Sequence, residues 1–225
     1  HLMPLEPAVL AREAAGEDSE LTAQERAALD AVSRDMGLWS LDAPEDVGGL
    51  GMPHVALVAV NEALGTTVAK YVLPPDSPNL AMLAATCTAE QREDYLAPYA
   101  RGETISAIGI SEPGAGADPA GMKTRAVRAD DGSGDWIING RKIWITRAAE
   151  ADFTILMAIT DPAEGAPPRS PASGKGQHRR GMSAFLVDRE TPGFNILRRI
   201  PMIGGEYTYE VALEDCRVPG WKLLG

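Results

Sequence analysis

Cysteine and histidine are scarce in this chain, which limits the metal and disulfide chemistry open to it. Its 225 residues include 2 cysteines, Cys87 and Cys216, and 3 histidines. Two cysteines so far apart in sequence favour a reduced, intracellular protein, although they leave a disulfide open. His54 and His178 have no cysteine or histidine at the spacing that metal ligands need, so we predict no metal site.

Basic residues and long apolar runs are also few. Lys and Arg total 21 against 32 Asp and Glu, and the formal net charge is −11. Because nucleic-acid binding requires clustered cations, we expect a small ligand or a protein partner and no nucleic acid. No apolar run is long enough to cross a membrane, so we expect no membrane span. The N-terminal stretch has no signal-peptide pattern, which favours a cytoplasmic location, or the mitochondrial matrix in a eukaryote.

The composition is otherwise that of an ordinary globular protein, with 44% apolar and 24% charged residues. A chain of 225 residues is long enough for one large domain or two modest ones. The local patterns predict two domains of an α+β protein. Residues 1–103 form an N-terminal α-helical domain, and residues 104–225 form a small antiparallel β-barrel or sandwich.

The helical prediction for the first hundred residues depends on apolar spacing and on residues that start or stop helices. Thr22 with Glu25 forms a plausible capping box, and Thr88 is a plausible N-cap. Pro98 is expected to stop the helix that Thr88 begins. These signals predict helices over residues 21–36, 53–65, 79–85 and 89–97.

The pattern changes to short strands after Gly102. Asn139-Gly140 separates two apolar runs and predicts a type I′ hairpin turn. Short strands with regular turn signals indicate a barrel or sandwich, not a βαβ fold. The strands are expected over residues 105–110, 122–129, 136–138, 142–146, 153–159, 183–187, 194–197 and 208–213.

Residues 105–118, ISAIGISEPGAGAD, combine an expected strand with a loop rich in Pro and Gly. Such a loop exposes several backbone N–H groups, and small side chains let a ligand approach the backbone. It therefore suits a phosphate or the polar edge of a planar cofactor, although alone it is more often a simple turn. Gly114 and Gly116 do not indicate a nicotinamide site, because no βαβ unit encloses them.

Residues 161–182 are rich in Pro, Gly and Ser and predict a long loop. A solvated, mobile loop is the favoured interpretation. The alternative is a basic lip that attracts a phosphorylated ligand. Its basic residues are Arg169, Lys175, Arg179 and Arg180.

Two motifs together resemble the flavin-binding segments of the acyl-CoA dehydrogenase family. They are residues 110–118, ISEPGAGAD, and residues 136–146, WIINGRKIWIT. Three further stretches resemble the family in the right order, and the resemblance covers most of the chain from about Leu21. These stretches are residues 44–51, PEDVGGLG, residues 184–194, AFLVDRETPGF, and residues 211–219, VALEDCRVP.

The resemblance implies FAD as the cofactor. It implies that Ser111 bonds the pyrimidine edge of the flavin, that Trp144 packs on the ring system, and that the Thr146 hydroxyl lies near the reactive nitrogen. A flat aromatic ligand needs an apolar face beside it, and donors at its polar edge favour the arrival of a hydride. The implied cofactor-binding residues are Ile108, Ile110, Ser111, Gly116, Ala117, Trp144, Ile145 and Thr146, and the implied substrate residues are Ala117 and Ser173.

The implied reaction is α,β-dehydrogenation of an acyl-CoA substrate to a 2-enoyl-CoA, with electrons passed to an electron-transfer flavoprotein. The family's base is a Glu of a C-terminal helical domain, and no residue here matches it. Glu112 is interpreted as a structural carboxylate that fixes the loop. We therefore expect a fragment that ends before the third domain, with no catalytic residue of its own and little or no activity. The family is typically homotetrameric, and we leave the fragment's assembly open.

Two alternatives of the same fold remain. One is an acyl-CoA oxidase or a flavin monooxygenase, whose reduced flavin would react rapidly with oxygen. The other is a non-catalytic subunit that resembles an acyl-CoA dehydrogenase and supports a partner chain.

Overall fold

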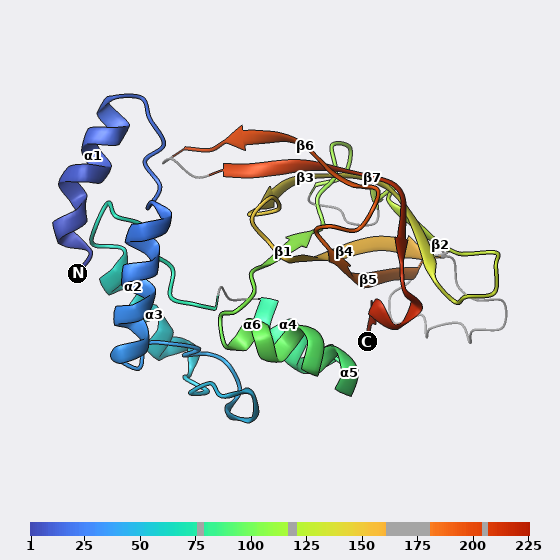
Figure 1. Cartoon of the computed structure of the whole chain (residues 1–225), viewed down its shortest axis with the longest axis horizontal. Coiled ribbons are helices and arrows are strands. Elements are labelled where there is room, and N and C mark those ends of the chain that lie inside the picture. The colour runs from blue at the N-terminus through green and yellow to red at the C-terminus, as the bar shows by residue number, and fades with distance from the viewer. Residues whose placement is uncertain (76–78, 117–120, 161–180, 204–206) are drawn as a thin grey trace, which may run out of the picture. The chain divides into compact units, whose positions relative to one another are not determined.

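The computed structural model describes residues 1–75, 79–116, 121–160, 181–203 and 207–225 (Figure 1). The chain divides into two compact units. The first contains His1–Ser106 and Pro201–Tyr207, and the second contains Ala107–Ile200 and Thr208–Gly225. Helices dominate the first unit and strands the second, which confirms the predicted α+β class.

The first unit begins its main helices where the sequence signals them. The Thr22 hydroxyl accepts a hydrogen bond from the Glu25 N–H at 3.2 Å, and the Glu25 carboxylate accepts one from the Thr22 N–H at 2.8 Å. This capping box satisfies N–H groups that a helix start leaves without partners. The helices are α1 (Glu6–Ala14), α2 (Ala23–Asp35), α3 (His54–Leu64), α4 (Asn79–Thr86), α5 (Ala89–Gln91) and α6 (Ala97–Ala100).

The predicted helix stop at Pro98 is wrong. Thr88 caps α5 as expected, but the chain continues through a π turn, Arg92–Leu96, into α6. In that turn the Ala97 N–H donates to the Arg92 carbonyl, five residues back. Pro98 follows in the first turn of α6, where a missing N–H and a fixed φ are tolerated. The helical run therefore passes the proline without a break.

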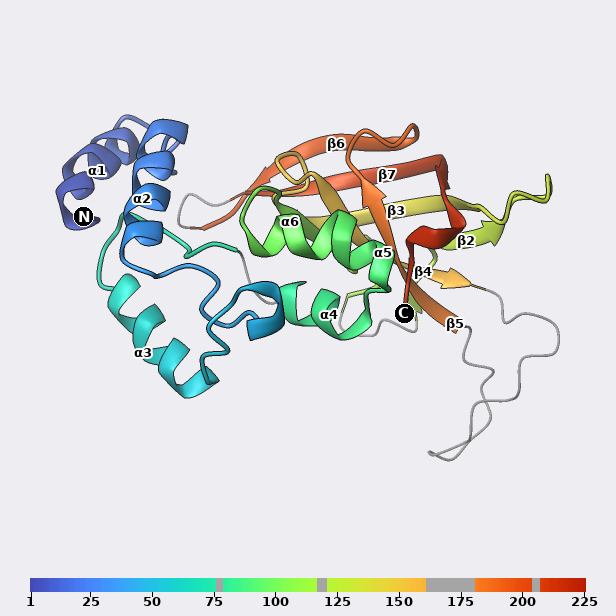
Figure 2. The same cartoon turned by 60° about the horizontal axis from the view of Figure 1, so that its bottom comes forward.

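The second unit is built on one sheet, whose strands appear in Figure 2. Its order is β6-β7-β3-β2-β4-β5-β8, and β1 pairs with β4. Its strands are β1 (Ser106–Gly109), β2 (Arg125–Arg128), β3 (Trp136–Thr146), β4 (Phe153–Thr160), β5 (Gly181–Asp188), β6 (Phe194–Pro201), β7 (Tyr207–Val218) and β8 (Leu223–Leu224).

The sheet differs from the expected antiparallel barrel in two ways. Strands β2 and β4 are parallel, with Arg125 opposite Ile159. The chain reverses once between β2 and β3 and again between β3 and β4, so β4 runs in the direction of β2 and pairs on its free side. Within the residues that the structure describes, the strand order also runs from β6 to β8 without closing.

The predicted hairpin turn at Asn139-Gly140 is wrong, because β3 runs straight through both residues. The Asn139 side chain donates to the Asp215 carboxylate at 3.0 Å and accepts from the Asp215 N–H at 2.8 Å, which anchors a bulge in β7. A Cβ on Gly140 would lie 2.4 Å from the Thr124 hydroxyl oxygen. These two residues therefore serve contacts between strands, and the chain reverses earlier, in the segment of residues 129–135.

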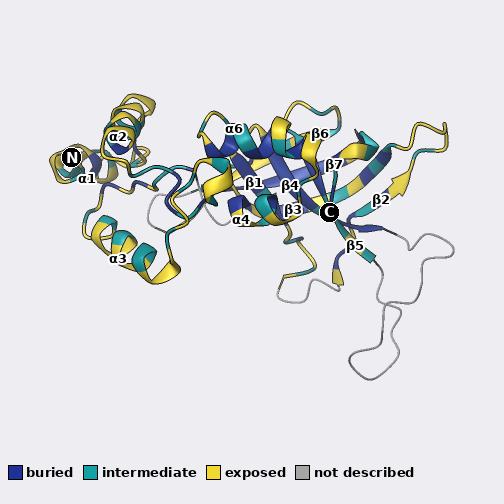
Figure 3. Cartoon of the chain, turned by 90° about the horizontal axis from the view of Figure 1, so that it is seen from below, coloured by how far each residue is buried: buried dark blue, intermediate teal, exposed yellow. Residues whose placement is uncertain are grey.

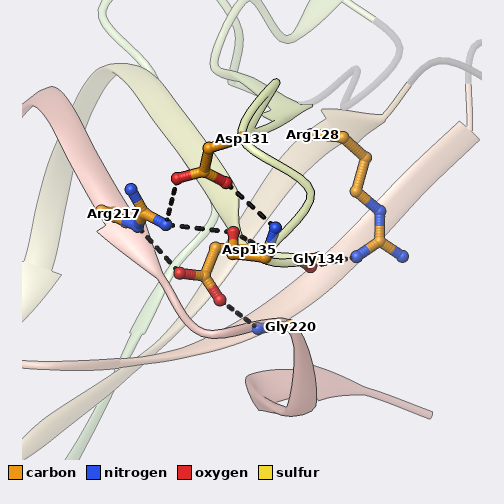
Figure 4. Close-up of polar contacts among 7 residues, drawn as sticks. Arg128, Asp131, Gly134, Asp135, Arg217 and Gly220 are labelled. Atoms are coloured by element: carbon orange, nitrogen blue, oxygen red, sulfur yellow. Dashed lines mark hydrogen bonds and ion pairs between the residues drawn. The ribbon is translucent and has the colours of Figure 1, made fainter.

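That reversal is tied to the end of β7 by Arg217 (Figure 4). The Arg217 guanidinium donates to Asp131 and Asp135 at 2.7 and 2.8 Å and to the Ser133 hydroxyl at 3.0 Å. Asp135 also accepts from the Gly220 N–H at 3.3 Å. The Arg217 side chain is 47% exposed, so these bonds fix the position of the loop more than they stabilise the fold.

The core of the second unit lies against the sheet, where Figure 3 shows most of the buried ribbon. Trp136 and Phe185 pack edge to face with their ring centroids 5.3 Å apart. Both cysteines are free, and Cys216 belongs to this core. Its largest other members are Ile138, Ile145, Leu156, Val187, Phe194, Tyr209, Val211, Leu213 and Val218.

Candidate functional site

The loop after β1 is a closed turn. The Glu112 N–H donates to the Ala115 carbonyl at 3.0 Å, and the Ala115 N–H donates back to the Glu112 carbonyl at 3.1 Å. Pro113 and Gly114 form the exposed tip between them. A Cβ added at Gly114 or at Gly116 would meet nothing within 4 Å, so the space beside this backbone is open to a ligand.

Glu112 attaches the loop to the start of β2. Its carboxylate accepts hydrogen bonds from the backbone N–H groups of Lys123 and Thr124 at 2.7 and 2.9 Å. Burial alone would raise the pKa of Glu112, but hydrogen bonds from Thr124, Lys123 and Lys142 outweigh burial and hold the pKa below its ordinary value of 4.5. These contacts support the interpretation of Glu112 as a structural carboxylate.

Lys142 lies under the same loop, and sequence reasoning overlooked it. Its side chain is 0% exposed, and Nζ lies 2.9 Å from the Glu112 carboxylate and 3.0 Å from the Ile110 carbonyl oxygen. Burial lowers the pKa of Lys142, and Glu112 opposes that shift. Lys142 lies four and six residues after the buried Ile138 and Trp136 of the same strand, a spacing that could have predicted a buried lysine with a partner.

Strand β3 brings Ser111 and Trp144 together. The Ile143 N–H donates to the Ser111 carbonyl at 2.9 Å, and Trp144 follows at the next position. The register of β3 against β7 shifts between Lys142 and Ile145, so Ile143 and Trp144 together face Glu210. Trp144 has a left-handed φ of 62° and is 53% exposed. A left-handed backbone costs a bulky residue about 1–2 kcal/mol, and such strain is concentrated at functional sites.

The remaining predicted cofactor residues differ in what they can offer. Thr146 is exposed, Ile110 is 37% exposed and Ile108 is half-buried. Ile145 is 1% exposed and belongs to the core, so its side chain is not accessible to a ligand. Ala117 and Ser173 lie outside the described residues, as do the four basic residues of the long loop.

The described residues fit a planar aromatic cofactor with a polar edge. Trp144 offers an accessible aromatic face, Thr146 offers an exposed hydroxyl, and the loop backbone near Gly114 and Gly116 is uncrowded. The described residues contain no group of three or more His, Cys, Asp or Glu that could hold a metal ion. Within the same residues, no helix combines the length and apolar character that a membrane span requires.

A separate apolar cavity of about 490 Å³ lies in the first unit. Leu29 and Val32 of α2, and Met36 immediately after the helix, contribute to its lining. Its polar residues Ser33 and Tyr71 bond to each other at 3.0 Å, and the Tyr71 hydroxyl also donates to Asp30 at 2.7 Å. Burial followed by the hydrogen bond to Asp30 raises the pKa of Tyr71. These groups stabilise one another, and the loop after β1 remains the better candidate site.

Comparison with known families gives two matches along the chain. Residues 7–103 match the N-terminal domain of acyl-CoA dehydrogenase, and residues 107–216 match the middle domain of acyl-CoA dehydrogenase.

Individual relatives and structures give the same result. (R)-Benzylsuccinyl-CoA dehydrogenase from Thauera aromatica is 36% identical over 233 residues, covering 100% of this chain and 54% of the relative. A putative acyl-CoA dehydrogenase from Mycobacterium abscessus has a TM-score of 0.77 at 28% identity, covering 98% of this chain and 55% of that chain. A glutaryl-CoA dehydrogenase from Mycobacterium smegmatis in complex with FADH2 has a TM-score of 0.52 at 33% identity, covering 64% of this chain and 33% of that chain. The chain thus spans about half the length of the curated relatives it matches.

Proposed function

This chain belongs to the acyl-CoA dehydrogenase family, and from that premise we propose that it forms the flavin-binding part of an FAD-dependent acyl-CoA dehydrogenase. The observation that carries the proposal is the pinned loop after β1. Glu112 and Lys142 hold this loop against β3, which places Ser111 beside the strained, exposed Trp144. The FADH2 in the glutaryl-CoA dehydrogenase of similar fold supports the choice of cofactor.

The chain's own residues would hold the flavin in three ways. Ser111 would donate a hydrogen bond to the pyrimidine edge, Trp144 would cover the ring system, and Thr146 would donate from its hydroxyl near the reactive nitrogen. Ile108, Ile110, Gly116 and the Ile145 backbone would complete the lining. When bound, FAD would supply a hydride acceptor for the β-hydrogen of an acyl-CoA thioester.

Removal of the α-proton requires a base that we assign to no residue of this chain. Glu112 is unsuited to this role, because its carboxylate already accepts bonds from Lys123, Thr124 and Lys142. We therefore propose that the base comes from another polypeptide segment, and that the described residues bind and orient the cofactor. An electron-transfer flavoprotein is the proposed electron acceptor.

The visible absorption spectrum of the protein reconstituted with FAD tests this function. Acyl-CoA thioesters of different chain length would be added without oxygen to the chain alone and to the full-length gene product. We expect bound flavin in both, and bleaching by one chain-length class only in the full-length product. A flavin that stays oxidised with every thioester, or the absence of bound flavin, would contradict the proposal, and rapid reoxidation by oxygen would indicate an oxidase.

A further inference from the structure

The ammonium group of Lys142 lies directly behind the peptide unit that joins Ile110 to Ser111. Nζ donates to the Ile110 carbonyl oxygen at 3.0 Å, and the lysine side chain is 0% exposed. The Ile110 carbonyl and the Ser111 N–H belong to the same peptide unit, and in a trans peptide they point in opposite directions. Because the carbonyl points inward to Lys142, the Ser111 N–H points away from the buried charge.

Two charged groups meet beside this peptide, the Lys142 ammonium and the Glu112 carboxylate. Nζ donates to the Ile110 carbonyl oxygen at 3.0 Å and to the Glu112 carboxylate at 2.9 Å. The carboxylate also accepts hydrogen bonds from the N–H groups of Lys123 and Thr124. The Lys142 ammonium is therefore a charge in direct hydrogen-bond contact with the Ile110–Ser111 peptide.

A cation bonded to a carbonyl oxygen polarises the whole amide. The polarised amide carries more positive charge on its N–H and becomes a stronger donor, and burial increases this effect because water does not screen it. The Ser111 N–H and the Ser111 hydroxyl are the two donors that this residue can present to the pyrimidine edge of the flavin. That edge gains negative charge when the flavin is reduced, so a stronger donor stabilises the reduced form more than the oxidised form.

We propose that Lys142 is a positioning residue that acts through the Ile110–Ser111 peptide to make the bound flavin easier to reduce. This inference rests on the proposed function, since it requires FAD beside Ser111. It differs from a structural role in one measurable respect. A residue that only holds the loop changes the affinities for oxidised and reduced FAD equally, whereas Lys142 changes their ratio.

The test is the midpoint potential of FAD bound to the chain, measured by equilibration with a dye of known potential, alongside the Kd of oxidised FAD. In Lys142→Met we expect the ratio of reduced to oxidised flavin at a fixed potential to fall about tenfold, or about 30 mV for a two-electron couple. Lys142→Gln keeps a neutral donor and should shift the ratio less. It also serves as the second variant if Lys142→Met does not fold.

Lys123→Met is the matched control, because it removes the same charge from an exposed side chain at the other end of the loop. Its potential should equal that of the parent chain. Equal potentials in the parent and both Lys142 variants would overturn the role of Lys142 and leave the flavin site intact. A parent chain that binds no FAD at saturating concentration would overturn the proposed site itself, and this inference with it.

Discussion

Trp144 shows how a single residue can be placed against its backbone preference. Its φ of 62° lies in the left-handed region, where a residue without a Cβ is favoured. The bulge between Lys142 and Ile145 imposes this conformation and turns the indole outward. The strained backbone of Trp144 therefore occurs together with an exposed indole ring, which a contact with a cofactor would need.

We predict that Trp144→Gly is more stable than Trp144→Ala by about 0.5–1 kcal/mol, because glycine adopts this positive φ without the steric cost that a Cβ brings. Urea denaturation of the two variants measures the difference. Val127 in β2 is 48% exposed and is the control. There, Ala should be more stable than Gly, and the same order at both sites would contradict the prediction.

Both Trp144 variants should also bind FAD more weakly than the parent chain, by about tenfold or more.

Glu112 and Lys142 form a buried pair whose contribution should depend on pH. Hydrogen bonds hold the folded pKa of Glu112 below 4.5, so its stabilising contribution is present above that value and is lost as pH falls through the folded pKa. We predict that Glu112→Gln lowers the free energy of unfolding by about 3 kcal/mol at pH 7, because it leaves the Lys142 charge without its counter-charge.

Urea denaturation over a series of pH values checks this prediction. The difference between parent and Glu112→Gln should shrink as pH falls from 4.5 through the folded pKa, because the carboxylate is protonated first in the unfolded chain and then in the folded chain. Glu190→Gln is the control, because Glu190 is 79% exposed and its pair with Arg189 is at the surface. A difference that stays constant with pH would be inconsistent with an ionised Glu112.

At the scale of elements, the contact between β3 and the start of β2 supports the candidate site. Gly140 of β3 lies against Thr124, and the Thr124 N–H is one of the bonds that hold Glu112. A side chain at position 140 would press on the segment that anchors the flavin loop. The spacing of these strands therefore decides both local stability and the position of Ser111.

We predict that Gly140→Ala destabilises the chain by about 1–3 kcal/mol and weakens FAD binding, because its Cβ would lie 2.4 Å from the Thr124 hydroxyl oxygen and 2.7 Å from its Cα. Thermal denaturation and a flavin fluorescence titration measure the two effects. Gly114→Ala is the control for stability, since its Cβ meets nothing within 4 Å. Equal stability of the two variants would show that β3 can move away from Thr124.

At the scale of the whole molecule, helix α3 has an unusual surface. It is rich in apolar residues, yet none of its side chains is buried in the described structure. Val55 is 79% exposed and Val58 is 65% exposed. A largely apolar helix normally packs against other chain segments. We therefore expect the exposed apolar residues of α3 to favour association with another molecule in solution.

We predict that the isolated chain self-associates as its concentration rises, and that the double substitution Val55→Lys/Val58→Lys reduces this association without lowering stability. Sedimentation equilibrium measures the association, and thermal denaturation measures the stability. Glu62→Lys on the same helix is the matched control, since it also changes the net charge by two but leaves the apolar residues in place. A monomeric parent chain, or an equal effect of Glu62→Lys, would refute the prediction.

The sequence by itself determined the features that depend on near neighbours in the chain. Thr22 and Thr88 cap helices because each bonds a backbone N–H three residues away. The apolar runs that were expected as strands are strands, because burial of alternating or continuous apolar residues is a local pattern. Family membership was also readable, since the two flavin-segment motifs are short and continuous.

Only the tertiary structure decided the features that depend on contacts between distant residues. Asn139-Gly140 looks like a turn locally, but its bonds to Asp215, 76 positions away, keep β3 straight. The left-handed Trp144 follows from the register of β3 against β7, and the buried pair of Glu112 and Lys142 joins residues 30 positions apart. Hydrogen bonds and ion pairs over such separations form only after the chain has folded, so a local pattern cannot specify them.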